Sequence, residues 1–361
     1  MNLTQPGRTL PVQIKDHTSS ELAVLLSGAG VTPRLARQLQ SAAVRRGASE
    51  IPRFLPETSP HLLARVREVT SIPALELVDK IVSPRDGFTR YLFRGEGVDP
   101  FEAVRIPLLH RAGDLKHVVC VSSQVGCALR CDFCATGRLG FRRNLATWEI
   151  VDQVVHIQRD SVEPVRGVVF MGMGEPMLNY DSVMRAAEVL SEPCGMAISA
   201  KAITISTVGI VPMIQRFTSE RRPFRLIVSL TKADSGERRA LLPIEATYPL
   251  PELISALRDY HAATGTRVTL AWTLISGYNT KLSDAKQLAE LTRGLPIKLD
   301  LIDVNDSTGR YVAPSDEERN GFLDSLRVEL GMPVARRYSG GQDIDGGCGM
   351  LAGTSEQRIS L

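Results

Sequence analysis

The sequence is poor in several features that define specialised classes of protein. It holds only six cysteines in 361 residues, which excludes a disulfide-stapled scaffold. No run of about 18 uninterrupted apolar residues occurs, so no transmembrane helix is expected. Residues 1–15 are polar, include two prolines and lack the apolar centre of a signal peptide. We therefore expect a cytoplasmic protein with reduced cysteines and no membrane contact.

Neither sign of charge dominates the chain. Lys and Arg number 43 against 40 Asp and Glu, a formal net charge of +3. This balance excludes a polycationic arm for nucleic acid but allows a local basic face. Arginines gather in three places, and their planar fork suits phosphate recognition. The three groups are Arg130, Arg138, Arg142 and Arg143; Arg216, Arg221, Arg222 and Arg225; and Arg336 with Arg337.

The apolar pattern changes twice along the chain, which is longer than one ordinary domain of about 150 residues. Helical periodicity comes first, short strands separated by turn residues follow, and strand and helix patterns then alternate. The predicted units are an N-terminal helical accessory domain (1–79), a β-hairpin bridge (80–113), a core (114–353) and a tail (354–361). The alternation predicts an α/β core whose parallel sheet closes into a full or partial barrel. Its chemistry would lie at the C-terminal ends of the strands.

Seven strands and several helices are expected in this core. The strands are Val118–Ser122, Gly167–Met171, Ala202–Ser206, Leu226–Leu230, Arg267–Leu274, Lys298–Ile302 and Val334–Tyr338. The helices include Trp148–Gln158, Ser182–Leu190, Pro251–Ala263, Ser283–Leu295 and Ser315–Leu330. Ser315-x-x-Glu318 is a capping-box pattern, which predicts where the last helix begins.

The sharpest local motif is Cys127-Ala-Leu-Arg-Cys131-Asp-Phe-Cys134. Three thiolates on one loop can bind a single metal centre. On a four-iron cluster they leave one iron open to a chelating small molecule. A structural zinc ion would need a fourth ligand, which Cys120 could supply. The spacing favours the iron–sulfur interpretation, and zinc remains the alternative.

The C-x3-C-x2-C spacing, with Phe133 before the last cysteine, resembles the radical S-adenosylmethionine (SAM) superfamily. Five further motifs occur in the order typical of the RlmN/Cfr family of RNA adenine methyltransferases. They are Cys120-Val-Ser-Ser-Gln-Val-Gly-Cys127, Gly140-Phe-Arg-Arg-Asn-Leu145, Phe170-Met-Gly-Met-Gly-Glu-Pro-Met-Leu-Asn179, Ile205-Ser-Thr-Val-Gly-Ile-Val-Pro212 and Asp343-Ile-Asp-Gly-Gly-Cys-Gly-Met-Leu-Ala-Gly353. The resemblance implies a partial, TIM-like (β/α) radical SAM barrel, a 4Fe–4S cluster, SAM, an RNA substrate and a reducing electron donor protein.

The Gly172-Met-Gly-Glu-Pro176 turn follows an apolar strand. Glycines let the backbone approach a ligand, and the Glu175 carboxylate can accept hydrogen bonds from an amino acid's ammonium group. The resemblance assigns SAM contacts to seven positions: Gly174, Glu175, Ser206, Ser229, Leu230, Thr231 and Asn305.

Cys348 lies in a glycine-rich stretch, which we interpret as a segment able to change conformation. The resemblance implies that one SAM methylates Cys348, that its methyl carbon then loses a hydrogen to the radical made from a second SAM, and that the resulting methylene radical adds to adenine. It also implies that Cys120 resolves this adduct by forming a disulfide with Cys348, and that Glu102 removes the ring proton. Cys194 matches no motif, and we interpret it as a packing residue.

Two positions depart from the family pattern. Thr231 stands where the family usually has histidine, and Asp306 stands where it usually has proline.

The leading hypothesis is methylation of adenine C2 in 23S ribosomal RNA, with tRNA as a further substrate. Methylation at adenine C8 or of another RNA is the alternative within the family. A non-catalytic RNA-binding module with a structural metal is the alternative outside it. The sequence leaves the oligomeric state open.

Overall fold

The computed structural model describes residues 11–109, 115–306 and 308–353. Its centre is a ten-stranded sheet with the order β14-β13-β12-β11-β10-β9-β6-β5-β4-β3. The first seven strands of this order are parallel, and β5, β4 and β3 continue the sheet antiparallel to their neighbours. Within the described residues the sheet stays open, with β14 and β3 at its edges, so the predicted barrel is a partial one.

The predicted core strands are all present, displaced by three residues or fewer at each end. Their bounds are β6 Leu115–Cys120, β9 Val165–Phe170, β10 Ile203–Thr207, β11 Arg225–Ser229, β12 Val268–Leu274, β13 Ile297–Asp303 and β14 Ala335–Arg337. The strands at the centre of the sheet are largely buried: Arg166 is the one exposed residue of β9, and in β12 only Thr269 and Thr273 are partly exposed. Trp272 of β12, for example, is fully buried and packs against Phe322, with ring centroids 6.1 Å apart.

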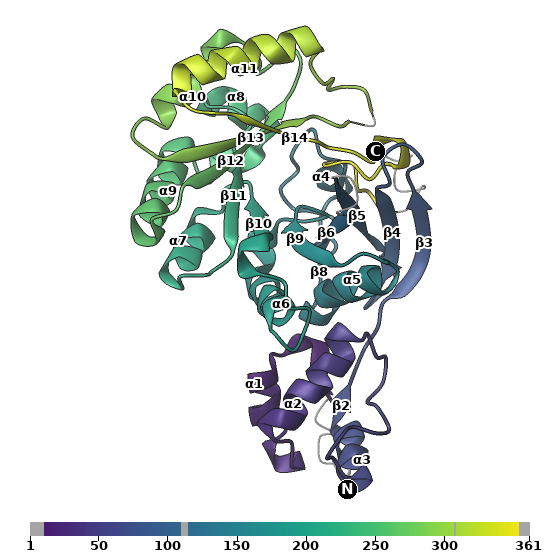
Figure 1. Cartoon of the computed structure of the whole chain (residues 1–361). Coiled ribbons are helices and arrows are strands. Elements are labelled where there is room, and N and C mark those ends of the chain that lie inside the picture. The colour runs from purple at the N-terminus through teal and green to yellow at the C-terminus, as the bar shows by residue number, and fades with distance from the viewer. Residues whose placement is uncertain (1–10, 110–114, 307, 354–361) are drawn as a thin grey trace, which may run out of the picture.

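Helices cover the outer side of the curved sheet (Figure 1). The five expected ones are α5 Thr147–Arg159, α6 Tyr180–Ser191, α9 Leu250–Thr264, α10 Leu282–Leu291 and α11 Asp316–Leu330. Ser315 caps α11 as predicted, since its hydroxyl accepts from the Glu318 amide at 3.1 Å. Three shorter helices had not been singled out: α4 Ala135–Leu139, α7 Val211–Ser219 and α8 Ser235–Leu241.

The N-terminal helices pack together and contact α5. They are α1 Ser19–Leu25, α2 Pro33–Gln40 and α3 Pro60–Val69, and strands β1 Val12–Gln13 and β2 Thr70–Ser71 pair beside them. Buried Lys15 donates to Asp152 of α5 at 2.6 Å, and Asp16 accepts from the Trp148 amide at 2.6 Å. An acidic group at a helix N-terminus is favoured by the helix dipole, so Asp16 helps to fix this junction.

The predicted hairpin bridge is built into the core sheet. Its strands are β3 Glu76–Val82, β4 Thr89–Arg94 and β5 Phe101–Leu109, and β5 pairs directly with β6. The unit boundaries remain a prediction; the one at 113 and the predicted tail 354–361 fall outside the described residues. Among the described helices, none has the length and apolar content needed to span a membrane.

Candidate active site

Two neighbouring cavities open at the C-terminal ends of the parallel strands. The first, which we call the cysteine-loop cavity, is lined by predicted site residues from the cysteine motif and three strand ends: Cys127, Cys131, Cys134, Gly174, Glu175, Ser206 and Ser229. The second, the paired-cysteine cavity, is lined by Cys120 and by mostly apolar side chains. Cys348 lines both cavities, so it lies between the cysteine motif and Cys120.

The loop that carries the three cysteines leaves the sheet after β6 and ends at α4. The Cys127 amide donates to the Gly140 carbonyl at 3.1 Å, and the Cys134 amide donates to the Cys131 carbonyl at 3.1 Å. Burial raises the pKa of Cys127 to about 12 and holds that of Cys131 well above its usual value. Both are therefore thiols in the metal-free protein, and a bound cation would have to displace their protons.

The three thiols of the cysteine loop line one cavity, as the three protein ligands of a 4Fe–4S cluster would. A four-iron cluster binds each thiolate through a different iron, so its ligands can stand further apart than those of a single ion. Cys120, the proposed fourth zinc ligand, lines the other cavity instead. We conclude that the three thiols suit a 4Fe–4S cluster and that the zinc alternative is disfavoured.

Glu175 presents a carboxylate to the cysteine-loop cavity. Its two oxygens accept from the amides of Val208 and Met177, both at 3.0 Å. Burial nevertheless raises the pKa of Glu175 to about 7, because the two hydrogen bonds only partly offset the loss of water. Gly174 precedes it at φ +99°, and a Cβ there would lie 2.5 Å from the Cβ of Gln124. The turn thus holds an acidic group ready for an amino group.

Three predicted SAM contacts lie away from this cavity in the structure. Leu230 and Thr231 are fully buried and do not line it. The Asn305 amide donates to the Ser339 hydroxyl at 2.8 Å and to the Cys348 carbonyl at 3.2 Å. Asn305 therefore contacts the segment that carries Cys348, and a role for these three residues in binding SAM remains a prediction.

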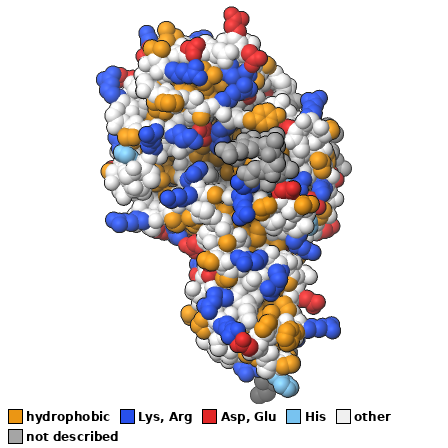
Figure 2. Space-filling model, viewed as in Figure 1, with side chains coloured by type: hydrophobic (Ala, Val, Ile, Leu, Met, Phe, Trp, Pro, Cys, Tyr) orange, Lys and Arg blue, Asp and Glu red, His pale blue; other side chains and the backbone are white. Residues whose placement is uncertain are grey.

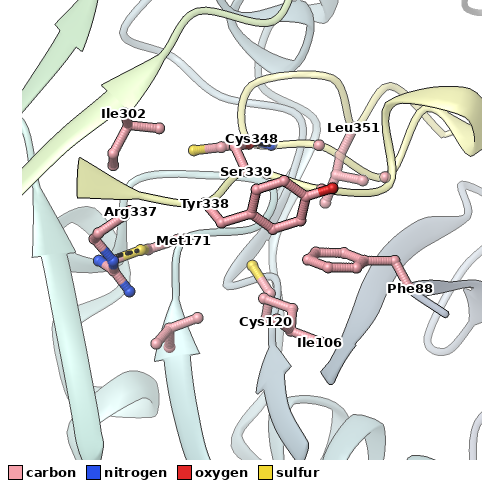
Figure 3. Close-up of a pocket in the computed structure, with 14 residues that line it drawn as sticks. Phe88, Ile106, Cys120, Met171, Ile302, Arg337, Tyr338, Ser339, Cys348 and Leu351 are labelled. Carbon is pink, nitrogen blue, oxygen red and sulfur yellow. Dashed lines mark hydrogen bonds between the residues drawn. The ribbon is translucent and has the colours of Figure 1, made fainter. Parts of the chain in front are cut away.

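Cys120 and Cys348 approach the paired-cysteine cavity from opposite sides, one from the end of β6 and the other from the C-terminal segment (Figure 3). All six cysteines of the chain are free thiols, so the disulfide that the resemblance implies is absent from this structure. Burial and the neighbouring Cys348 raise the pKa of Cys120 to about 12, and the Arg337 guanidinium acts in the opposite direction. Cys194 lies against α2, and its thiol donates to Gln40 Oε1 at 2.8 Å.

Glu102 is buried on β5 and lines neither cavity in the described structure. Its Oε2 accepts from the amides of Ala352 and Gly353 at 2.8 and 2.9 Å, and its Oε1 lies 3.3 Å from Arg90. The carboxylate is thus occupied by the segment that follows Cys348.

Two arginines near the cavities had no role there assigned from sequence, although Arg337 was placed in a basic group. Of the described residues that line the paired-cysteine cavity, Arg337 alone is charged, and it lies 3.9 Å from the Met171 sulfur (Figure 3). Arg238 is fully buried, pairs with Glu245 and donates to the carbonyls of Leu230 and Val208 at 3.1 and 2.7 Å. Arg238 lies in a charged helical segment that looks solvent-facing in sequence. No local pattern reveals such a contact.

The predicted arginine groups divide into paired and exposed members. Arg138, Arg143, Arg216 and Arg222 form ion pairs with Asp306, Glu149, Asp181 and Glu188 respectively. Exposed arginines without an ion pair to any described residue are Arg130, Arg142, Arg221 and Arg225. Figure 2 shows Lys and Arg side chains spread over one face of both the core and the accessory domain. These exposed arginines are the better candidates for phosphate contacts.

The fold and the cysteine loop are those of a radical SAM enzyme, and the Radical SAM superfamily model matches residues 121–290. A probable RNA methyltransferase of Myxococcus xanthus is 46% identical over 349 residues, 95% of each chain. The dual-specificity RNA methyltransferase RlmN of Syntrophobacter fumaroxidans is 40% identical over 344 residues, 94% of this chain and 98% of that one. The chain belongs to the RlmN/Cfr family of radical SAM RNA methyltransferases. A crystal structure of a radical SAM methyltransferase from Sphaerobacter thermophilus superposes with a TM-score of 0.86 at 37% identity, covering 95% of this chain and all of that one.

Proposed function

We propose that the protein methylates C2 of an adenine in RNA through a methyl-cysteine at Cys348. The observation that carries this proposal is the position of Cys348 on the wall shared by both cavities. A cysteine placed there can face a methyl donor on one side and a base on the other. Relatives named dual-specificity RNA methyltransferases support an RNA substrate, with 23S ribosomal RNA expected first and tRNA second.

The three thiols of the cysteine loop would hold the cluster, and Glu175 would accept from the amino group of SAM. When bound, the cluster and SAM together supply an electron, a methyl group and a hydrogen-abstracting radical. Ser206, one residue before the end of β10, and Ser229, the last residue of β11, line the same cavity as Glu175, and their hydroxyls would orient the rest of SAM. A reducing protein must deliver the electron from outside the chain.

The protein's own residues would carry the later steps. The Cys348 sulfur accepts the methyl group and gives up its proton. After the methylene radical has bonded to adenine, Glu102 would take the ring proton and the unpaired electron would return to the oxidised cluster, which leaves a closed-shell thioether. The Cys120 thiolate then attacks the Cys348 sulfur. The S–S bond forms as the C–S bond breaks. The electron pair of the broken bond stays on the methylene carbon, and protonation of that carbon gives the methyl group on adenine. In this structure Glu102 is held by the Ala352 and Gly353 amides, so its action as a base requires that segment to move.

The test is a methylation assay with anaerobically reconstituted protein. RNA is incubated with protein, SAM and a low-potential reductant, then digested, and the methyladenosines are mapped by mass spectrometry against C2 and C8 standards. We expect 2-methyladenosine from the wild type and none from Cys348→Ala. A product at C8 would contradict the regiochemistry. RNA binding without any methylated base, in protein that carries zinc and no iron, would support the non-catalytic module instead.

A further inference from the structure

The segment that carries Cys348 is hydrogen-bonded to strands that lie outside the parallel part of the sheet. We define residues 338–353 as the Cys348 loop, and β3, β4 and β5 as the antiparallel extension. Figure 1 shows the Cys348 loop (yellow) lying beside β4 and β5 (dark blue). The extension contacts this loop near both of its ends, through Asp86 and Glu102, and Cys348 lies between these two contacts. A further contact lies between them, where the Ser83 hydroxyl donates to Asp343 at 2.9 Å.

The first contact is made by Asp86, in the turn between β3 and β4. Its Oδ2 accepts from the Gly341 amide at 2.9 Å and from the Tyr338 hydroxyl at 3.0 Å. Its Oδ1 accepts from the Phe88 amide at 3.2 Å. Burial alone would raise the pKa of Asp86, but hydrogen bonds from Gly341, Ser83 and Phe88 outweigh it and hold the pKa below its usual value. Asp86 is therefore ionised at neutral pH, and its hydrogen bonds to the loop are charge-assisted.

The loop can approach Asp86 this closely only because glycines stand at the contact. A Cβ on Gly340 would lie 2.4 Å from Asp86 Oδ2 and 2.5 Å from a ring carbon of Phe88. Gly341 has φ +71°, a conformation that side chains other than glycine disfavour. These two glycines, which we interpreted from sequence as sources of mobility, thus permit a tight contact.

The second contact is Glu102 on β5, which accepts from the amides of Ala352 and Gly353. Between the two contacts the Asn305 amide donates to the Cys348 carbonyl at 3.2 Å. A short chain with both ends fixed samples a small volume. Cys348 is therefore confined to the wall that the two cavities share, and its thiol lines the same cavity as that of Cys120.

We propose that Asp86 is a positioning residue for Cys348: by holding Gly341 and Tyr338 against the β3–β4 turn, it keeps the Cys348 thiol beside the cavity it shares with Cys120. The inference deepens the proposed function and rests on it, since it concerns the cysteine that would carry the methyl group. Asp86 touches no reacting atom; it acts through the loop backbone.

The experiment measures the effective concentration of Cys348 for Cys120 in the full-length, cluster-loaded protein under anaerobic conditions. Protein is equilibrated in glutathione buffers, where oxidised glutathione takes up two electrons and both thiol protons and becomes two reduced glutathiones. The Cys120–Cys348 disulfide is quantified by peptide mass spectrometry. The variants are Asp86→Ala and Asp86→Asn, with Asp79→Ala as matched control, because Asp79 is an exposed carboxylate on the same hairpin. Tyr338→Phe removes one hydrogen bond and keeps the ring.

We expect Asp86→Ala to lower the effective concentration at least tenfold, Asp86→Asn and Tyr338→Phe to lower it less, and Asp79→Ala to match the wild type. If Asp86→Ala fails to fold, the milder variants Asp86→Asn and Tyr338→Phe can still be compared with the wild type. An unchanged or higher value in all three Asp86 and Tyr338 variants overturns the proposal. If the wild type forms no disulfide, the Cys120 step of the proposed function fails. Asp86 is then judged by hydrogen exchange at residues 341–353, where faster exchange in the Asp86 variants supports its role and equal exchange overturns it.

Discussion

Replacement of Glu175 by Gln tests whether this carboxylate binds SAM, because the raised pKa of Glu175 predicts both a loss of affinity and a change in its pH dependence. In the structure both carboxylate oxygens face backbone amides and burial raises the pKa of Glu175 to about 7. A hydrogen bond to a charged group contributes about 1.5–3 kcal/mol. Loss of the charge should therefore weaken SAM binding by about 10- to 150-fold at a pH where wild-type Glu175 is ionised.

The affinity for SAM should also change with pH, in a direction that the pKa of Glu175 sets. Below its pKa of about 7, Glu175 must lose a proton before it can accept from the amino group of SAM, so wild-type affinity should rise with pH. Between pH 6 and pH 8 the ionised fraction rises about tenfold, and the affinity should rise with it. Glu175→Gln should lack this rise, and titration of SAM's own amino group affects both proteins equally.

The assay is anaerobic equilibrium binding of SAM to cluster-loaded protein at a series of pH values. Glu252→Gln is the control, since Glu252 is exposed on α9, away from the cysteine-loop cavity. Equal affinities and parallel pH slopes for wild type and Glu175→Gln would refute the assignment of this carboxylate to SAM.

Three further predictions concern the cysteine loop and the backbone around the site. Cys131→Ala should lose the iron and the brown absorbance of the reconstituted protein while Cys194→Ala keeps both; equal iron content in the two variants would contradict the ligand assignment. Gly174→Ala should lower the free energy of unfolding by about 2 kcal/mol or more because it combines φ strain with a clash at Gln124. Gly265→Ala, at φ +67° with no atom within 4 Å, should cost about 1 kcal/mol in the same urea titration. Arg238→Met should cost about 3–5 kcal/mol because it leaves the buried Glu245 carboxylate without its cation, whereas exposed Arg327→Met should change stability by no more than about 0.5 kcal/mol.

The sheet could be predicted because its signals are local. Each parallel strand is a short apolar run, and each following helix repeats apolar residues at helical spacing, as in α9 and α11. The cysteine motif and the Glu175 turn are also contiguous in sequence, and the structure brings Gly174, Glu175, Ser206 and Ser229 to one cavity. These residues follow apolar strands, whose C-terminal ends meet at one edge of a parallel sheet.

What the sequence could not reveal are contacts between distant segments. Nothing local shows that Glu102 would bond the amides of residues 352 and 353, or that Asp86 would hold Gly341. The antiparallel extension looked like a bridge because hairpin signals do not say which sheet a strand joins. Asn305 matches a position that contacts SAM in the family, yet its side-chain amide donates hydrogen bonds to the Cys348 loop. Such pairings depend on the folded path of the chain.

The central claim is that Cys348 itself receives a methyl group. The most direct measurement is peptide mass spectrometry of cluster-loaded protein after incubation with isotopically labelled SAM and reductant, before RNA is added. We expect one labelled methyl group on the peptide that contains Cys348 and none on the peptide that contains Cys120. An unmodified Cys348 in protein that still methylates RNA would contradict it.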